Sequence, residues 1–126
     1  MNIELFDKLT AAIETKNGSV IRGILLGENP TDASNVLIRF NENEICTILS
    51  NLGNDVAANI ILELPDDIRT SVLAELANES ILEIIEELDS DDAADLISNL
   101  DEHKSKEILK GMNPRDSSEV QTLLQY

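Results

Sequence analysis

The sequence predicts an all-α fold, a right-handed superhelix (solenoid) of about ten short helices, and three observations lead to this prediction. Hydrophobic residues make up 42% of the 126 residues but aromatic ones only 2%, so aliphatic side chains must build the core, which favours helices over sheets. Apolar residues recur with the spacing of one helix face. That pattern itself recurs every twelve residues from Asn29 to Leu124. The length suits a single domain covering residues 1–126.

Residues 1–28 are expected to form an irregular N-terminal pair of helices. The first is indicated by Ile3, Leu5, Phe6, Leu9 and Ile13. Asn17-Gly18 predicts a turn between the two helices. The second helix is indicated by Val20, Ile21, Ile24 and Leu25.

Residues 29–124 divide without a gap into eight twelve-residue units. They are NPTDASNVLIRF, NENEICTILSNL, GNDVAANIILEL, PDDIRTSVLAEL, ANESILEIIEEL, DSDDAADLISNL, DEHKSKEILKGM and NPRDSSEVQTLL. Positions 5, 8, 9 and 12 of each unit share one helix face and are mostly apolar, the main exception at position 5 being Arg69. Positions 1 to 3 are rich in residues that cap helices or form turns. Each unit therefore predicts one helix of about eight or nine residues followed by a turn.

Helices this short are marginal alone, so we expect them to be stabilised by stacking on their neighbours, with two units forming a hairpin. Gln121 occupies position 9 of the last unit, where every other unit is aliphatic. It marks either a terminal cap that faces water or a contact with a following domain.

The net charge of −16 argues against binding to nucleic acid or to anionic membranes and favours cations or basic partners. The charge is concentrated in residues 54–102, which hold fifteen acidic residues and one basic residue, Arg69, and so carry −14. Residues 103–126 hold four basic and three acidic residues. The acidic centre is therefore the part of the chain where a cation is most expected.

Few residues suggest catalysis or membrane insertion. The single histidine, His103, is expected on the surface, and the single cysteine, Cys46, is expected to be a buried, inert thiol in a reducing compartment. No glycine-rich phosphate loop or nucleophile elbow is present. Glu4 and Asp7 interrupt any signal peptide, and no apolar run approaches the ~20 residues that span a bilayer. The sequence thus predicts a soluble, cytosolic chain that is not an enzyme.

The stretch DSDDAADLISNL, residues 89–100, begins like a calcium-binding loop. Ala93, Ala94 and Leu100 stand where such a loop needs an oxygen ligand, a glycine and a bidentate glutamate, so an EF-hand is excluded.

Asp91 and Asp95 of this stretch lie four residues apart and share one helix face. The preceding unit places Glu79 and Glu83 in the same way. Helix capping and the helix dipole account for Asp91 but poorly for Asp95, which lies beyond the first turn. Two interpretations stay open, one structural and one in which the pair contributes to a weak Mg2+ site that retains water ligands.

The segments ILEIIEELDSDDAADLISNL and KEILKGMNPRDSSEVQTLLQY resemble the cytosolic N-terminal domain of MgtE-type magnesium transporters. The resemblance is carried by the pattern E-x-L-x-x-D-D-x-A-D-L followed by a helix that ends L-L-x-Y, and it covers about residues 29–126. In such transporters a pair of cystathionine-β-synthase-type (CBS) domains and a transmembrane pore follow. Neither is found in this sequence, so we expect the chain to be one domain of a longer transporter.

The resemblance implies a regulatory role at the cytoplasmic face of the bacterial cell membrane, in a transporter that is a homodimer. In the family, Mg2+ ions between the acidic surfaces of this domain and of the CBS domains close the pore. The family's aspartates fall on Asp91 and Asp95 of this chain. A further family acid falls on Asn59, whose amide brings no charge. Mg2+ is therefore expected as the cofactor, bound weakly unless the CBS partner is present.

Two other functions remain as alternatives. One is a protein-interaction module of the flagellar motor switch type, similar to FliG, which also consists of short stacked helices. Its E-H-P-Q element is not found, since Glu102-His103 is followed by Lys104. The other is a stand-alone acidic scaffold that binds a basic protein.

Overall fold

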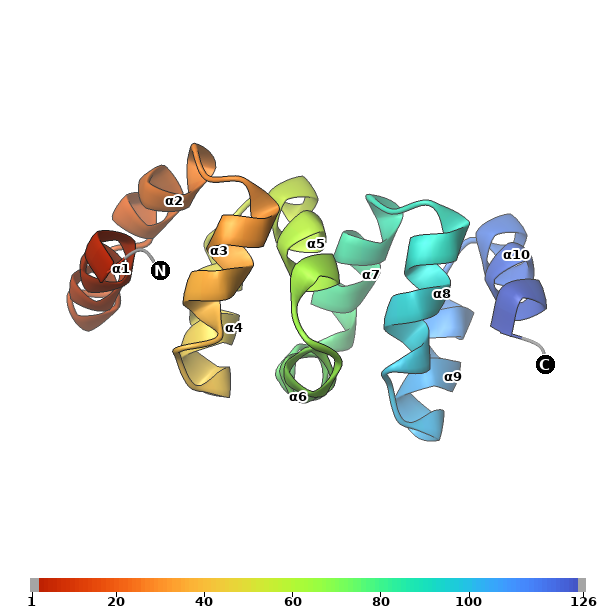
Figure 1. Cartoon of the computed structure of the whole chain (residues 1–126). Helices are drawn as coiled ribbons and strands as arrows, with labels where there is room; N and C mark the ends of the chain where they lie inside the picture. The colour runs from red at the N-terminus through yellow and green to blue at the C-terminus, as the bar shows by residue number, and fades with distance from the viewer. Residues whose placement is uncertain (1–2, 125–126) are drawn as a thin grey trace.

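The computed structural model describes residues 3–124, and in this range it contains ten α-helices and no strand (Figure 1). The helices are α1 (Ile3–Glu14), α2 (Gly18–Leu26), α3 (Pro30–Leu37), α4 (Glu42–Ser50), α5 (Asn54–Glu63), α6 (Asp66–Glu75), α7 (Asn78–Glu86), α8 (Ser90–Ser98), α9 (Glu102–Gly111) and α10 (Pro114–Leu124). Each twelve-residue unit holds one helix. The predicted all-α class and the predicted number of helices are therefore confirmed, while the right-handed sense of a superhelix stays a prediction.

Five of the eight helices of the repeat begin where the first position of a unit supplies an Asn or Asp cap. The side chains of Asn29, Asn41, Asp89, Asp101 and Asn113 accept hydrogen bonds from the backbone N–H three residues later, at 2.8, 2.8, 3.0, 2.8 and 2.9 Å. Each bond satisfies one of the N–H groups that a helix start leaves without a partner. The turn residues of the repeat thus fix the helix starts.

The turn predicted at Asn17-Gly18 is placed differently. Asn17 is the N-cap of α2, its side chain accepting from the backbone N–H of Val20, and Gly18 is already the first helical residue. The turn precedes them, with Lys16 in the left-handed region at φ 54°. A side chain at position 18 would collide with the carboxamide of Asn51, so glycine serves a close approach there and not a turn.

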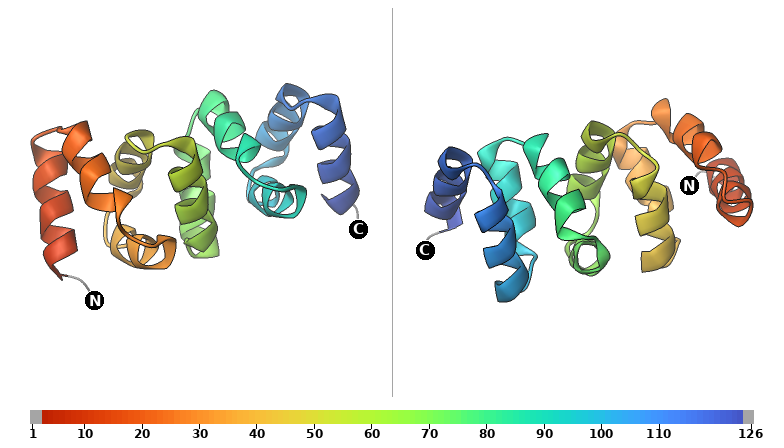
Figure 2. Two further views of the ribbon diagram at one scale, coloured as in Figure 1. Left: turned by 90° about the horizontal axis from the view of Figure 1, so that it is seen from above. Right: turned by 180° about the vertical axis from the view of Figure 1, so that it is seen from behind.

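Alternate helices pack on one another along an elongated molecule whose described ends lie far apart (Figures 1 and 2). One row runs α3–α5–α7–α9, and the other contains the close pairs α4–α6 and α8–α10. The backbones of α6 and α8 approach less closely than those of the neighbouring pairs in that row. From α3 onward most helices therefore cover the apolar face of the helix two places along the chain, while α1 packs chiefly on α2.

The core follows the repeat. Position 8 is buried in all eight units, as Val36, Ile48, Ile60, Val72, Ile84, Leu96, Ile108 and Val120. Position 9 is buried from Leu37 to Ile97, but Leu109 is only partly buried and Gln121 is exposed. The exposure of Gln121 agrees with either prediction made for it. Within residues 3–124, no helix is long and apolar enough to cross a membrane.

Candidate functional site

The carboxylates in and just before α8 differ in whether they bond to other residues of the domain. Asp89 caps the helix, and its side chain accepts from the backbone N–H of Asp92 at 3.0 Å. Asp91 and Asp95 are exposed, and their carboxylates make no hydrogen bond or ion pair with other residues of the described range 3–124. Both are therefore free to meet a cation or a partner surface.

Asp95 and Asn59 line one hollow of about 430 Å³, which we call the Asn59–Asp95 hollow. It lies among α3, α5, α6 and α8, and Figure 1 shows α5 and α6 between α3 and α8. Its full lining is Pro30, Asn59, Leu62, Glu63, Arg69, Asp92 and Asp95. The structure thus joins two of the three predicted site residues, and Asp91 is not part of this lining.

Asp92 reports the surroundings of one carboxyl group in the hollow. Burial of the carboxyl, followed by the negative charges of Asp89, Asp95 and Asp91, raises the pKa of Asp92 above its ordinary value. The neighbouring carboxylates make a negative contribution to the potential at Asp92, which favours cations there.

Arg69 is a residue of this hollow that the sequence marked only as an exception to the repeat. Its side chain is 16% exposed, and its Nη2 lies 3.8 Å from Oδ1 of Asp66. Its Nε is buried without a hydrogen-bond acceptor. The signal that could have found it was present, since it is the one base of the acidic block and the one large charged residue at position 5.

A complete metal centre is not assembled within the described residues 3–124, where no group of three or more His, Cys, Asp or Glu side chains is placed to hold an ion. The pair Glu79 and Glu83 differs from Asp91 and Asp95, because the carboxylate of Glu83 accepts a hydrogen bond from the Asn54 amide at 3.1 Å. A Mg2+ ion at Asp91 or Asp95 would take its remaining ligands from water or from a partner.

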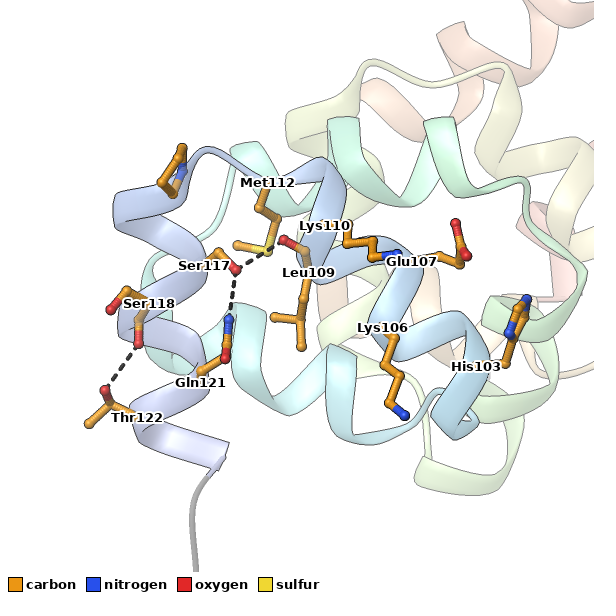
Figure 3. Close-up of a pocket in the computed structure, with 11 residues that line it drawn as sticks. His103, Lys106, Glu107, Leu109, Lys110, Met112, Ser117, Ser118, Gln121 and Thr122 are labelled. Carbon is orange, nitrogen blue, oxygen red and sulfur yellow. Dashed lines mark hydrogen bonds between the residues drawn. The ribbon is translucent and has the colours of Figure 1, made fainter.

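A larger open groove of about 980 Å³ lies between α9 and α10, and the sequence reasoning did not anticipate it (Figure 3). His103, Lys106 and Lys110 line its α9 side. Ser117 already forms two hydrogen bonds within the domain. Its hydroxyl donates to the backbone carbonyl of Leu109 at 2.9 Å and accepts from the Gln121 amide at 3.1 Å. His103 is exposed, as predicted.

Cys46 is partly buried, and its thiol lies 3.7 Å from the backbone carbonyl of Val72, to which it can donate. Burial, followed by the nearby carboxylates of Glu75 and Glu42, raises the pKa of this thiol. Because the thiolate is the reactive form, this environment suits the inert role predicted for Cys46.

The short stacked helices and the acidic central block define an all-α helical-repeat domain. The chain belongs to the family of the MgtE intracellular N domain, whose model matches residues 28–126. The expected resemblance is thereby confirmed.

Two solved structures have the same fold. The cytosolic domain of the Mg2+ channel MgtE in complex with ATP gives a TM-score of 0.84 at 23% identity, over 96% of this chain and 50% of that one. The soluble part of a magnesium transporter gives 0.83 at 19% identity, over 98% of this chain and 49% of that one. The chain thus spans about half the length of these relatives. Among curated proteins, none matches.

Proposed function

We propose that this chain is the Mg2+-sensing regulatory domain of a magnesium transporter, at the cytoplasmic face of a bacterial cell membrane. The observation that carries the proposal is the pair of exposed, unengaged carboxylates of Asp91 and Asp95, within a block of charge −14, in a chain of the MgtE N domain family. Its partner is the pair of CBS domains of the same chain, in a homodimeric transporter. The role is regulatory and not catalytic.

The physical basis is mutual repulsion that a divalent cation relieves. Asp91 and Asp95 stand at i and i+4, where like charges cost a few tenths of a kcal/mol, roughly, in a single helix. Docking a second acidic surface adds to that cost unless Mg2+ lies between them. At high Mg2+ the two surfaces close and the pore shuts, and at low Mg2+ they separate.

The ligand count explains why the partner is needed. Mg2+ prefers six oxygen ligands and keeps several waters, so the carboxylates of Asp91 and Asp95 supply a minor part of its shell. Asn59 can add an amide oxygen but no charge. Each ion therefore binds this domain weakly and is completed by the CBS surface.

The family assignment supports one of the alternative functions over the others. A match over residues 28–126 favours a transporter domain over a flagellar motor-switch module or a stand-alone acidic scaffold. We therefore propose only the transporter function.

Limited proteolysis of the full-length transporter tests the proposal. Cleavage between this domain and the CBS domains should slow as Mg2+ rises through the millimolar range. The double variant Asp91→Ala, Asp95→Ala should lose part of that protection. A matched control is Asp55→Ala, Asp67→Ala, which removes two exposed acids of the same block from the starts of α5 and α6. Equal protection of both double variants would contradict the proposal.

A further inference from the structure

Arg69 stands at position 5 of its unit, where the other units have a small or aliphatic residue, and it lines the Asn59–Asp95 hollow. Position 5 is Ala, Ile or Ser in the other seven units. Those residues let neighbouring helices approach closely, whereas α6 and α8 are held further apart than α4 and α6 or α8 and α10. The larger side chain of Arg69 lines the space between them, next to Asp92 and Asp95 of α8.

Four charged side chains set the net charge of the lining of the hollow. Glu63, Asp92 and Asp95 contribute three carboxylates, and Arg69 contributes one guanidinium, so the lining carries −2. One Mg2+ ion would neutralise that charge. A guanidinium stays protonated at any physiological pH, so the positive charge of Arg69 is permanent.

Arg69 is also held in place. Its side chain is mostly buried, and it pairs with Asp66 one turn earlier on α6 at 3.8 Å. Asp66 in turn accepts a hydrogen bond from the Asn99 amide at 2.9 Å, which ties the end of α8 to the start of α6. Burial and this pairing favour a guanidinium that stays beside the hollow, where it would oppose an approaching metal ion.

We propose that Arg69 is a built-in counter-cation of the Asn59–Asp95 hollow, which lowers the affinity of its carboxylates for Mg2+ and so sets the Mg2+ concentration at which they are occupied. This inference rests on the proposed function, because it concerns the regulation of the same surface. The uncharged Asn59 acts in the same direction. Together they shift the occupancy of Asp95 toward higher Mg2+ than an acidic residue at position 59 and an uncharged residue at position 69 would.

The inference is tested on the 126-residue chain by following ¹⁵N-labelled amides around residues 59–63 and 92–95 during titration with Mn2+ as a paramagnetic probe, and with Mg2+ in competition. Arg69→Gln should tighten Mg2+ binding roughly three- to tenfold, the effect of removing one charge near a divalent ion at a partly solvated site. Arg69→Lys, which keeps the charge, should bind like the wild type. Asp95→Asn should reduce the broadening that Mn2+ causes in the amide signals around residue 95.

Arg115→Gln is the matched control, because it removes the same charge from a side chain that is 88% exposed on α10. It should leave the affinity at the hollow unchanged. An Arg69→Gln titration that coincides with that of Arg115→Gln would overturn the inference. If Arg69→Gln does not fold, Asn59→Asp in the wild-type background takes its place. This substitution also makes the charge of the hollow more negative by one unit, and it does so from an exposed position. Unchanged Mg2+ binding by Asn59→Asp would also overturn the inference.

The proposed function and the inference about Arg69 can be refuted independently of one another. The titration uses no CBS domain, so a transporter that showed no Mg2+-dependent protection from proteolysis would remove the proposed function and leave the titration result intact. Conversely, full protection in the wild-type transporter combined with equal affinities of wild type and Arg69→Gln would remove only the inference about Arg69.

Discussion

The buried hydroxyl of Ser34 on α3 donates a hydrogen bond to the backbone carbonyl of Glu63, the last residue of α5, at 3.1 Å. The last carbonyls of a helix have no partner within it, so this bond satisfies one of them across a helix interface. The Thr31 hydroxyl also donates to the Glu63 carboxylate, at 2.7 Å. The two bonds fix the edge of the hollow at which Glu63 lies.

We expect Ser34→Ala to lower the free energy of unfolding by about 1–2 kcal/mol, because the carbonyl it leaves behind is shielded from water. Urea denaturation followed by circular dichroism measures this. Ser50→Ala is the control, since the exposed Ser50 hydroxyl bonds only to Thr47 in its own helix and should cost less than about 0.5 kcal/mol. Equal losses in the two variants would show that the Ser34 bond does not stabilise the interface.

Lys104 on α9 caps the end of α6 from outside. Its ammonium donates to the backbone carbonyls of Leu76 at 2.6 Å and of Ala74 at 3.2 Å. A cation at a helix C-terminus is favourable, so Lys104→Met should destabilise the domain by about 1–2 kcal/mol, and by less at high salt. Thermal denaturation measures the effect. The control Lys106→Met, which breaks only an exposed ion pair with Glu102, should lower the free energy of unfolding by no more than about 0.5 kcal/mol. A Lys104 effect no larger than the Lys106 effect would argue against the cap.

Asp89, which caps α8, and Asp95, which has no bonded partner in the described range, should have different effects on stability when divalent cations are absent. Asp89→Ala removes the N-cap bond to Asp92 and should cost about 1 kcal/mol. Asp95→Ala removes an unengaged like charge and should be neutral or slightly stabilising. Thermal unfolding in the presence of a chelator checks both. A large loss in Asp95→Ala would mean that this carboxylate serves the fold.

Asp92 should make the stability of the domain depend on pH in an unusual direction for a carboxylate. Its pKa is raised in the folded chain above the ordinary value of 3.8, so between these two values the native state binds more protons than the unfolded state. The contribution of Asp92 to stability therefore falls as pH rises through this window. Asp92→Asn should be more stable than the wild type at pH 7, and the difference should vanish below pH 3.8. Denaturant midpoints across this range measure it, and a pH-independent difference would contradict the assignment.

The repeat made most of the fold predictable, because a twelve-residue period fixes both the face that is buried and the place where each helix begins. Position 8 is buried in every unit for this reason. The exception lies at Asn17-Gly18, since Asn followed by Gly serves equally as a turn and as a cap with a glycine at N1. The hydrogen bond from the Val20 N–H to the Asn17 side chain and the left-handed conformation of Lys16 identify the cap.

The site was predictable only in part. Spacing places Asp91 and Asp95 on one face of α8, and both are exposed there. They lie one turn, about 6 Å, apart along the axis, which is why one of them can line a hollow that the other does not. That Asn59 and Asp95 line one hollow depends on how units three apart are placed, and that Arg69 lines it with Asp95 depends on units two apart. A single sequence does not contain that geometry.

From α3 onward most helices pack on the helix two places along the chain, so the two rows lengthen or shorten together in steps of two helices. Removal of residues 101–124 would shorten each row by one helix and would leave every residue that lines the Asn59–Asp95 hollow in the chain. The length of the domain at this end is therefore independent of the composition of the hollow.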